Sequence, residues 1–469
     1  MSENRKPVIE PDFYGDFHCI GGQCSFTCCK EWKIAVDHET KKRWRKLSVP
    51  EAVLESGRVP EHACRSTLDK AQLSQFVVKK DGGEIIELLP NMRCPFLEDT
   101  ELCRLVLDYG EACLSETCHV FPRETHEFHD RTERTLVSCC PEIVDRLHEL
   151  KELHFTNLPY QDRAFLLEGN AVGCKERDAA AYRDRAFLLE GKDKLFQIRN
   201  IMMYWLKDAS VSNEVNLKRC LFMILDLFDK KKKGKTLDPG ECLKEDDVQK
   251  LTEMILAMPK DMQASIEEQN ALFLDITENY RKEGRYQGLL NPLYAMAEQL
   301  SREFEEAEPV RMDEICALRA DVVAAYAPLL RNYLVAEAFA TLLIPGCTLR
   351  DMVLQLEWMI TEYVLIVHAM VLEILSEDAA ETAKCTSNSE ENAGDAIPSP
   401  GSQGAADGRT YAAEDHDAVN APLAYPKVRE LLILIARMTG YDGDEIEVYL
   451  CDSFENPVWP WGYADYLLA

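Results

Sequence analysis

The stretch Cys19-Ile-Gly-Gly-Gln-Cys24-Ser-Phe-Thr-Cys28-Cys29 places four thiols in eleven residues, and Trp32 follows closely. This density exceeds what packing needs, because the adjacent residues Cys28 and Cys29 cannot both face one side of a regular element. Thiolates at short intervals bind soft metals or iron–sulfur clusters. The spacings overlap the short ligand loops of zinc sites without repeating their usual pairs. We therefore expect a metal or cluster to organise this part of the chain.

Further thiol groups follow in the same third of the chain. Eleven of the 18 cysteines lie in residues 1–140, and eight of the ten histidines lie before residue 155. The later groups are Cys94-Pro-Phe-Leu97, Leu102-Cys103-Arg-Leu105, Cys118-His-Val-Phe-Pro-Arg123 and Ser138-Cys139-Cys140-Pro141-Glu142. Pro and Glu in the last group suit the start of a helix over residues 143–153. The positive end of that helix favours thiolate over thiol.

Composition sets the broad class of the protein. The 469 residues are 46% hydrophobic, which allows a sizeable core and two or three domains. The net charge of -29 disfavours nucleic acid and anionic membranes as partners. It is compatible with a lysine-bearing protein substrate, although acidic cytosolic proteins are common and the charge by itself favours that simpler explanation. Residues 1–7 have no apolar run, so we expect no secretory signal and few disulfides. The most apolar run, 358–372, is too short to span a bilayer. We expect a soluble, cytoplasmic protein.

The hydrophobic pattern predicts a mainly α protein with a Cys-rich α+β domain at its start, followed by a helical, bundle-like body. In the Cys-rich part we expect a strand at 32–37, a helix at 40–47, and a hairpin pairing 75–78 with 85–89. Pro328 should bend or break one later helix. Helices are predicted over residues 196–205, 217–228, 246–258, 266–280, 292–304, 312–343, 349–375, 426–439 and 444–451.

These patterns divide the chain into five parts. Residues 1–155 form the Cys-rich domain, and 196–376 form the helical domain. Between them, 156–195 holds a local duplication, in which the decapeptide at 160–169 recurs at 182–191 with one change. Residues 377–422, rich in Ser, Gly, Ala and Asp, are predicted to be a disordered linker. The last part, 423–469, should be helical, with an aromatic tail at 457–463 that docks on the body.

The order of the N-terminal motifs resembles that of the flagellin lysine-N-methylases. The opening Phe17-His-Cys-Ile-Gly-Gly-Gln-Cys through Asp37 is similar to the start of that family. So are the Cys94 and Cys103 group, the stretch from Leu107 to Arg123 and the stretch Glu133-Arg-Thr-Leu-Val-Ser-Cys-Cys-Pro-Glu142. The same thiol pattern marks a broader superfamily expected to chelate zinc or iron. Over residues 195–375 the resemblance is weaker and rests on the helical pattern and on Leu329-Leu-Arg-Asn-Tyr-Leu334.

The resemblance implies a set of ligands, cofactors and partners. Carried over by position, the metal-binding thiols are Cys19, Cys24, Cys28, Cys29, Cys94, Cys103, Cys118 and Cys140. Cys113 and Cys139 stand where the family has other residues. The implied cofactors are a 4Fe-4S iron–sulfur cluster, with zinc as the alternative, and S-adenosylmethionine (S-adenosyl-L-methionine). The implied partner is flagellin. Eight thiols exceed the four that one cubane takes, so some are structural, exchangeable or part of a second site.

Lysine methylation also needs a neutral amine, because a lysine side chain with a pKa near 10.4 is protonated at neutral pH. The protein must desolvate the amine or supply a base. Asp37 and Glu142 are candidates near the thiols, although an end-of-strand residue and a helix first-turn residue explain them as well. His119, beside Cys118, could bind metal or lie at the surface. The competing hypothesis is a non-catalytic zinc- or iron-binding protein, or a redox sensor, with a partner-binding helical body. No Gly-rich nucleotide fingerprint is present in the sequence.

Overall fold

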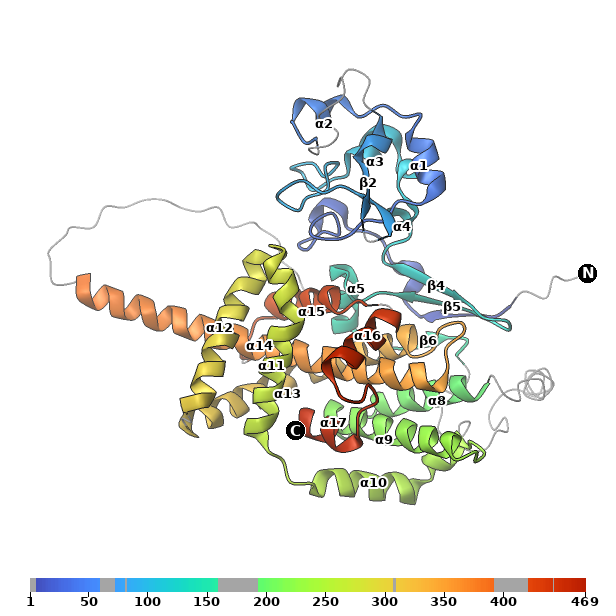
Figure 1. The fold of residues 1–469 in the computed structure, drawn as a ribbon, viewed down its shortest axis with the longest axis vertical. Helices are drawn as coiled ribbons and strands as arrows, with labels where there is room; N and C mark the ends of the chain where they lie inside the picture. The colour runs from blue at the N-terminus through green and yellow to red at the C-terminus, as the bar shows by residue number, and fades with distance from the viewer. Residues whose placement is uncertain are drawn as a thin grey trace, which may run out of the picture.

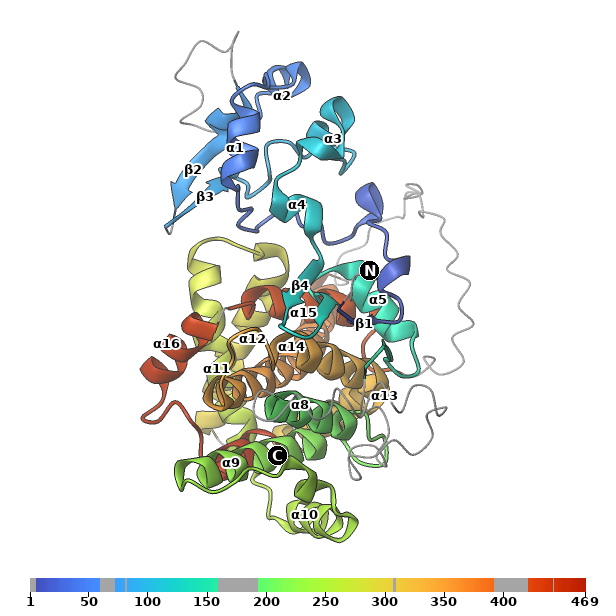
Figure 2. The same cartoon turned by 90° about the vertical axis from the view of Figure 1, so that its right-hand side faces the viewer.

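The computed structural model describes residues 6–59, 72–80, 82–158, 193–306, 309–391, 421–441 and 443–469. Within these residues the protein is mainly α-helical, as the sequence predicts. A Cys-rich module stands at one end of a larger helical body, at the top of Figure 1 and of the rotated view in Figure 2. The duplicated decapeptides at 160–169 and 182–191 lie outside the described residues.

The Cys-rich module has a hydrophobic core separate from that of the body. Its centre is aromatic: the Phe96 ring lies 5.9 Å from Trp44 and 5.0 Å from Phe76, and all three side chains are buried. Burying three such rings stabilises the module by several kcal/mol, at about 2 kcal/mol each. The elements around this core are α1 (His38–Trp44), α2 (Glu51–Glu55), β2 (Val77–Lys80), β3 (Gly83–Ile86), α3 (Arg104–Tyr109) and α4 (Glu116–Val120).

The predicted hairpin is confirmed, whereas the predicted strand at 32–37 is wrong. Strands β2 and β3 pair antiparallel, with Val77 opposite Ile86. Before them, Ala35 makes a single bridge to Ile85, and no longer strand forms in residues 32–37. The reason lies at Asp37, whose carboxylate accepts a hydrogen bond of 2.8 Å from the Thr40 amide and so caps α1. An aspartate at this position starts a helix, and the extended segment ends there.

A four-stranded sheet joins the module to the body. Its order is β4-β5-β1-β6, with β1 (Val8–Pro11) parallel to β5 (Thr132–Leu136) and antiparallel to β6 (Phe155–Thr156). Strand β4 (Arg123–Glu127) follows α4 directly and pairs antiparallel with β5. Chain segments from both ends of the Cys-rich region therefore meet in one sheet. Short 3-10 turns occur at Tyr14–Asp16, Gly21–Gln23, Leu73–Phe76, Glu111–Cys113 and Pro239–Leu243.

The body consists of long helices close to the predicted ranges. Helix α13 continues through Pro328, so this proline does not break it. The described helices are α5 (Pro141–Glu149), α8 (Asp193–Leu206), α9 (Asn213–Lys232), α10 (Glu245–Ala257), α11 (Met262–Lys282), α12 (Gln287–Glu306), α13 (Pro309–Thr341), α14 (Leu349–Glu391), α15 (Tyr425–Met438), α16 (Gly443–Ser453) and α17 (Trp461–Leu467).

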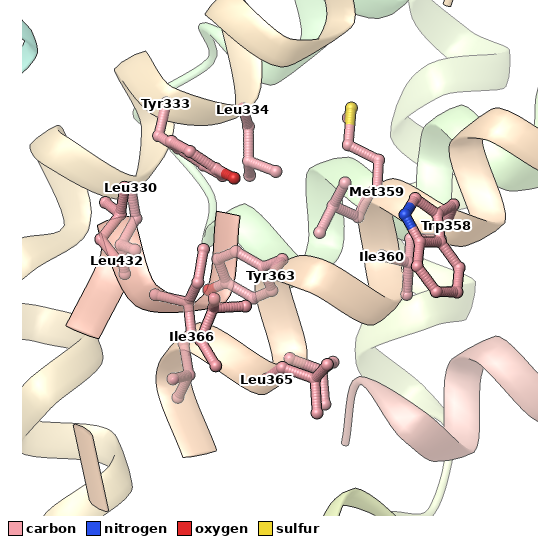
Figure 3. Close-up of a cluster of buried hydrophobic side chains, with 14 of the residues drawn as sticks. Leu330, Tyr333, Leu334, Trp358, Met359, Ile360, Tyr363, Leu365, Ile366 and Leu432 are labelled. Atoms are coloured by element: carbon pink, nitrogen blue, oxygen red, sulfur yellow. The ribbon is translucent and has the colours of Figure 1, made fainter. Parts of the chain in front are cut away.

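Helix α14 forms the centre of the body. Its side chains Trp358, Tyr363 and Ile366 pack in the buried cluster of Figure 3. In the described part of the chain, one segment is long and apolar enough to cross a membrane, namely residues 349–379, with a mean hydropathy of 1.7. The apolar run at 358–372 lies within this segment, in the helix that the sequence predicts over residues 349–375. Because 94% of its apolar window is buried inside the protein, α14 has the position of a core helix.

The aromatic tail docks on the body, as predicted. The Trp459 amide donates to the Glu357 carboxylate at 2.8 Å, and the Trp461 indole donates to the Lys218 carbonyl at 3.2 Å. Before the tail, α14 extends to Glu391, into the stretch predicted as a linker. Residues 392–420 of that stretch lie outside the described residues.

Asn332 of α13 explains why α5 ends at Glu149 rather than at the predicted residue 153. Its side-chain NH2 donates to the carbonyls of Leu147 and Leu150 at 2.9 and 2.8 Å, and its Oδ1 accepts from the Leu153 amide at 3.0 Å. One buried amide thus satisfies the end of α5 and turns the chain toward β6. This residue belongs to the Leu329–Leu334 segment that carries the resemblance in the body.

Asn332→Ala should lower the free energy of unfolding by about 2–4 kcal/mol, because it leaves three buried backbone groups without partners. Urea unfolding followed by circular dichroism measures this loss. Gln299→Ala is the matched control, since that amide donates to Glu303 on an exposed helix face and should change stability by less than about 0.5 kcal/mol. Equal stability of both variants would contradict the assignment.

Candidate functional site

The thiol groups, separate in sequence, are brought together by backbone contacts in the module. The Cys94 amide donates to the Cys29 carbonyl at 2.8 Å, which places the second thiol group beside the first. Cys103 forms a bridge with Leu97 and stands at the start of α3. In α4, the Cys118 amide donates to the Ser115 hydroxyl at 3.2 Å. The motifs therefore meet through local turns and caps.

Electrostatics identify Cys28 as the centre of this group. Negative charge on Cys28 raises the pKa of six other thiols, so all six lie around it. They are Cys24, Cys29, Cys94, Cys103, Cys118 and Cys140. Seven of the eight predicted ligands thus converge. The eighth, Cys19, is exposed. Among the thiols with a shifted pKa, only that of Cys24 is raised by the charge of Cys19.

Cys28 is the thiol most ready to ionise in this group. A hydrogen bond from Cys29 is the main reason that the pKa of Cys28 lies below the ordinary thiol value, and the Arg437 charge lowers it further. The same hydrogen bond and burial raise the pKa of Cys29. Burial raises the pKa of Cys118 to about 12. The group therefore holds one favoured thiolate among thiols that ionise poorly.

The helix start at Cys140 favours the thiolate less than the sequence suggested. Cys140 is the N-cap of α5, and the amides of Ile143 and Glu142 do lower its pKa. Burial outweighs them and raises the pKa of Cys140 to about 12. The expected effect of the helix end is real, but desolvation is the larger one.

The structure places the other candidate residues from the sequence analysis in the core, at the surface or at helix starts. Cys113 is buried in the module core, where its carbonyl accepts from the Trp44 indole at 2.8 Å. His119 is exposed. Asp37 caps α1 and also accepts from the Glu116 amide at 3.1 Å, and Glu142 pairs with Arg146 at 3.1 Å within α5. These two carboxylates therefore have the helix-start roles given as the alternative to a catalytic base.

The seven convergent thiols fit a soft metal or an iron–sulfur cluster in chemical kind. Their thiolates repel one another in a buried site, and a bound cation would remove that repulsion. Their placement is less specific: among the described residues, no three His, Cys, Asp or Glu side chains are arranged as around one metal ion. The donor set thus matches the predicted cofactor, while the choice of ligands and metal stays a prediction.

Arg437 of α15 joins the first thiol stretch, residues 19–32 and called the thiol loop below, to the body. Its guanidinium donates to the carbonyls of Phe26 at 2.9 Å, Thr27 at 3.1 Å and Cys139 at 3.3 Å. It also lies over the rings of Phe26 and Trp32, at 4.5 and 5.1 Å from their centroids. One buried side chain therefore holds the first thiol stretch, the Cys139–Cys140 turn and the helical body together.

Two further contacts fix the same junction. Glu31 accepts at 2.6 Å from the Tyr286 amide, and its carbonyl accepts from the Tyr286 hydroxyl at 3.1 Å. Arg429 of α15 donates to both oxygens of Asp145, at 3.0 and 2.8 Å, and to the Ser25 hydroxyl at 3.0 Å. The thiol loop is thus held in place by a few side chains that lie between positions 145 and 437 of the sequence. Sequence reasoning missed these side chains because each contact joins segments that are far apart in the chain.

Carboxyl groups that sequence reasoning also missed lie behind the Cys139–Cys140 turn. The Ser138 hydroxyl donates to the Glu337 carboxylate at 2.8 Å, and the Thr439 hydroxyl donates to Glu362 at 2.5 Å. Burial, the charge of Glu362 and that of Glu124 raise the pKa of Glu337. The sequence offered one hint, since Tyr333 of the family-like segment faces the same carboxyls.

A separate cavity of about 630 Å³ lies at the far end of the body from the Cys-rich module, near α10 in Figure 1. It lies among α8, α9 and α10, and Lys207 and Arg219 line it together with several carboxylates. No cysteine lines it. The cavity is therefore not part of the thiol site.

Comparison with known proteins supports the relationship suggested by the motifs. The chain is 33% identical over 143 residues to the flagellar biosynthetic protein FliU of Salmonella muenchen, and this match spans 30% of the chain and 76% of FliU. It is 32% identical over 143 residues to the lysine-N-methylases of Salmonella choleraesuis and Salmonella typhimurium, of which it covers 32%. No family model matches the chain, and no solved structure matches it significantly. The chain therefore belongs to the family of FliU and the flagellin lysine-N-methylases.

Proposed function

We propose that this protein is a lysine N-methyltransferase that transfers a methyl group from S-adenosylmethionine to lysine side chains of flagellin in the cytoplasm. The observation that carries the proposal is the match to the lysine-N-methylases and FliU, joined to the convergence of the motif thiols around Cys28. Because the match spans about a third of the lysine-N-methylases, the activity and the substrate are proposals for this chain.

The thiols around Cys28 would hold a four-iron cluster or zinc, with Cys28, Cys29, Cys94, Cys103 and Cys118 in the module and Cys24 and Cys140 toward the body. Such a centre would supply a Lewis acid for the amine and carboxylate groups of S-adenosylmethionine, in a chain without a Gly-rich nucleotide fingerprint. The residues of the chain perform the other tasks. Arg437 fixes the thiol loop on the body.

The first experiment is anaerobic purification followed by analysis of iron, acid-labile sulfide and zinc. Methyl transfer is then measured with labelled S-adenosylmethionine and purified flagellin. We expect iron and sulfide, a spectrum that changes with S-adenosylmethionine, and label in flagellin lysines. Colourless zinc protein with an unchanged spectrum would contradict the iron–sulfur proposal, and absence of label would contradict the methyltransferase proposal.

Cys28→Ser should remove most of the bound metal and lower methyl transfer at least about a hundredfold, because it replaces the central and most easily ionised thiol. Metal analysis and the methyl-transfer assay measure the two effects. The control is Cys451→Ser, since that exposed cysteine on α16 lies outside the thiol group. Full metal content and activity in Cys28→Ser would contradict the assignment of Cys28.

The second candidate is a metal-binding or redox-sensing protein without catalysis. The observation that favours it is the separate hydrophobic core of the Cys-rich module, which could hold a metal without help from the body. It predicts a tight metal site and no affinity for S-adenosylmethionine. Calorimetric titration of the anaerobic protein with S-adenosylmethionine separates the two candidates.

A further inference from the structure

The cavity of about 630 Å³ among α8, α9 and α10 has the size of a small-molecule site, since such sites in proteins measure about 300–1,000 Å³. In Figures 1 and 2, α10 runs beneath α9 at the end of the body opposite the Cys-rich module. Neither a cysteine nor a histidine lines this cavity. Its lining therefore suits the binding of a ligand rather than thiol or metal chemistry.

Arg219 of α9 brings a buried guanidinium to the cavity wall, with 4% of the residue exposed. Two of its nitrogens donate to the Thr252 hydroxyl, at 2.9 and 2.6 Å. Its Nη1 donates to Asp208 at 2.9 Å and to Asn216 at 3.1 Å. A guanidinium has five N–H groups, so these four bonds leave one N–H of Nη2 without an acceptor among the described residues.

Trp205 of α8 supplies a second donor to the same cavity. The residue is 2% exposed and lines the cavity, and its indole N–H makes no hydrogen bond within the described residues. By contrast, the indoles of Trp44, Trp358 and Trp461 donate to backbone carbonyls at 2.8–3.2 Å. An indole N–H can only donate, and buried donors without partners are rare. A ligand with carboxylate oxygens would accept from both free N–H groups.

The exposed part of the cavity wall is acidic. It includes Glu152, Glu245 and Glu253. The two cations of the lining are each paired with a carboxylate already, at 3.2 and 2.9 Å. The lining therefore carries an excess of negative charge, which repels a simple anion and attracts an ammonium group.

Apolar side chains complete the cavity wall. Leu243 is buried, and Tyr204, Val211 and Val248 are half-buried. Contact with an aliphatic or aromatic group would remove this surface from water and stabilise a complex. The cavity thus combines donors for a carboxylate, carboxylates for an ammonium group and a surface for an apolar side chain.

We propose that this cavity binds a free α-amino acid with a large apolar side chain, as its zwitterion. The ligand carboxylate accepts from the free N–H groups of Arg219 and Trp205. Its ammonium group is attracted by Glu245 and Glu253, and its side chain packs against Leu243. This site is separate from the thiol centre, so the proposal does not depend on the methyltransferase function.

The test is calorimetric titration of the purified full-length protein with L-phenylalanine. L-Phenylalaninamide lacks the carboxylate of this probe, and N-acetyl-L-phenylalanine lacks its ammonium group. We expect L-phenylalanine to bind at least about tenfold more tightly than either analogue, because each analogue loses one charge-assisted contact.

Two variants assign the binding to this cavity. Trp205→Phe removes the indole N–H and keeps an aromatic ring, and it should weaken L-phenylalanine binding by about tenfold. Glu253→Gln changes an exposed residue, so it tests the site even if Trp205→Phe folds poorly, and it should weaken binding by about threefold.

Glu267→Gln is the matched control for Glu253→Gln. On α11, the Gln263 amide donates to Glu267 at 2.9 Å, just as Gln249 donates to Glu253 at 2.9 Å on α10. Glu267 does not line the cavity. We expect Glu267→Gln to bind L-phenylalanine as wild type does.

Four outcomes would overturn the amino-acid site. They are the absence of saturable L-phenylalanine binding to wild type, equally tight binding of either analogue, binding that neither Trp205→Phe nor Glu253→Gln weakens, and equal losses in Glu253→Gln and Glu267→Gln. None of these measurements involves methyl transfer, so their failure would leave the proposed methyltransferase standing. Failure of methyl transfer would likewise leave the amino-acid site standing.

Discussion

Replacing Arg437 by methionine is expected to slow the alkylation of Cys28 at neutral pH by about fivefold. Hydrogen bonding from Cys29 and the positive charge of Arg437 both lower the pKa of Cys28, and the variant loses the second of these. The pKa of Cys28 then rises, so the thiolate fraction at neutral pH falls, by about fivefold for the first pKa unit and about tenfold for each further unit. The midpoint of the rate–pH curve should move to higher pH.

The same substitution should lower the free energy of unfolding by about 3 kcal/mol or more. It leaves the carbonyls of Phe26, Thr27 and Cys139 without their donor, and buried unsatisfied carbonyls cost about 1–3 kcal/mol each. Metal-free, reduced protein is used for both measurements, with mass spectrometry to follow the labelled cysteine and urea to follow unfolding.

Arg429→Met is the control for Arg437→Met. Arg429 lies two turns earlier on α15 and also docks the thiol loop, through Asp145 and Ser25, but its charge is not among those that shift Cys28. We expect it to destabilise the junction while the alkylation rate of Cys28 stays as in wild type. An equal drop in the alkylation rate in both variants would show that docking, and not the charge of Arg437, activates Cys28.

The second large effect is expected for Arg199→Met, which should lower the free energy of unfolding by about 3–5 kcal/mol. The fully buried Arg199 of α8 donates to both oxygens of Glu133 in β5, at 2.5 and 2.8 Å, and so ties the sheet to the helical body. Arg131 also contacts Glu133 at 2.5 Å, but its single bond cannot replace the bidentate pair. Removing one partner leaves a buried carboxylate with incomplete compensation.

The stability contributed by this ion pair depends on pH through the pKa of Glu133. Burial alone would raise the pKa of Glu133, but Arg199 and Arg131 outweigh it and hold that pKa below the usual range. The pair therefore stabilises the protein above the ordinary glutamate pKa, and this contribution is lost as pH falls through the lower folded value. The stability difference between wild type and Arg199→Met should accordingly shrink as pH falls below the ordinary glutamate pKa.

A double-mutant cycle tests whether the effect belongs to the pair. Arg199→Met combined with Glu133→Gln should be more stable than Arg199→Met alone, because no buried charge is then left unpaired. Arg104→Met is the surface control, since the pair of Arg104 with Asp108 lies within one helix turn on the module and should contribute less than about 1 kcal/mol. Additive losses in the cycle would contradict a direct interaction.

Much of the helical body could be predicted from the sequence, because its helices are stabilised by periodic apolar faces that local patterns record. The predicted positions of helix ends were less accurate where residues far away in the sequence determine where the helix stops. Helix α5 stops at Glu149 because Asn332, far along the chain, takes its last carbonyls. Likewise, the expected strand at 32–37 gives way to the cap at Asp37 and a single bridge from Ala35.

The sequence by itself determined the mainly α class, the family and the cysteines that gather around Cys28, because closely spaced thiols and the order of motifs are properties of the chain. The tertiary structure alone decided what surrounds those thiols. Arg437 and the carboxyls of Glu337 and Glu362 are single charged residues in helical patterns, with no local feature to distinguish them. The shifted pKa values of this region come from burial and from partners that are far away in the sequence. The packing of α13, α14 and α15 against the Cys139–Cys140 turn creates both the burial and these contacts.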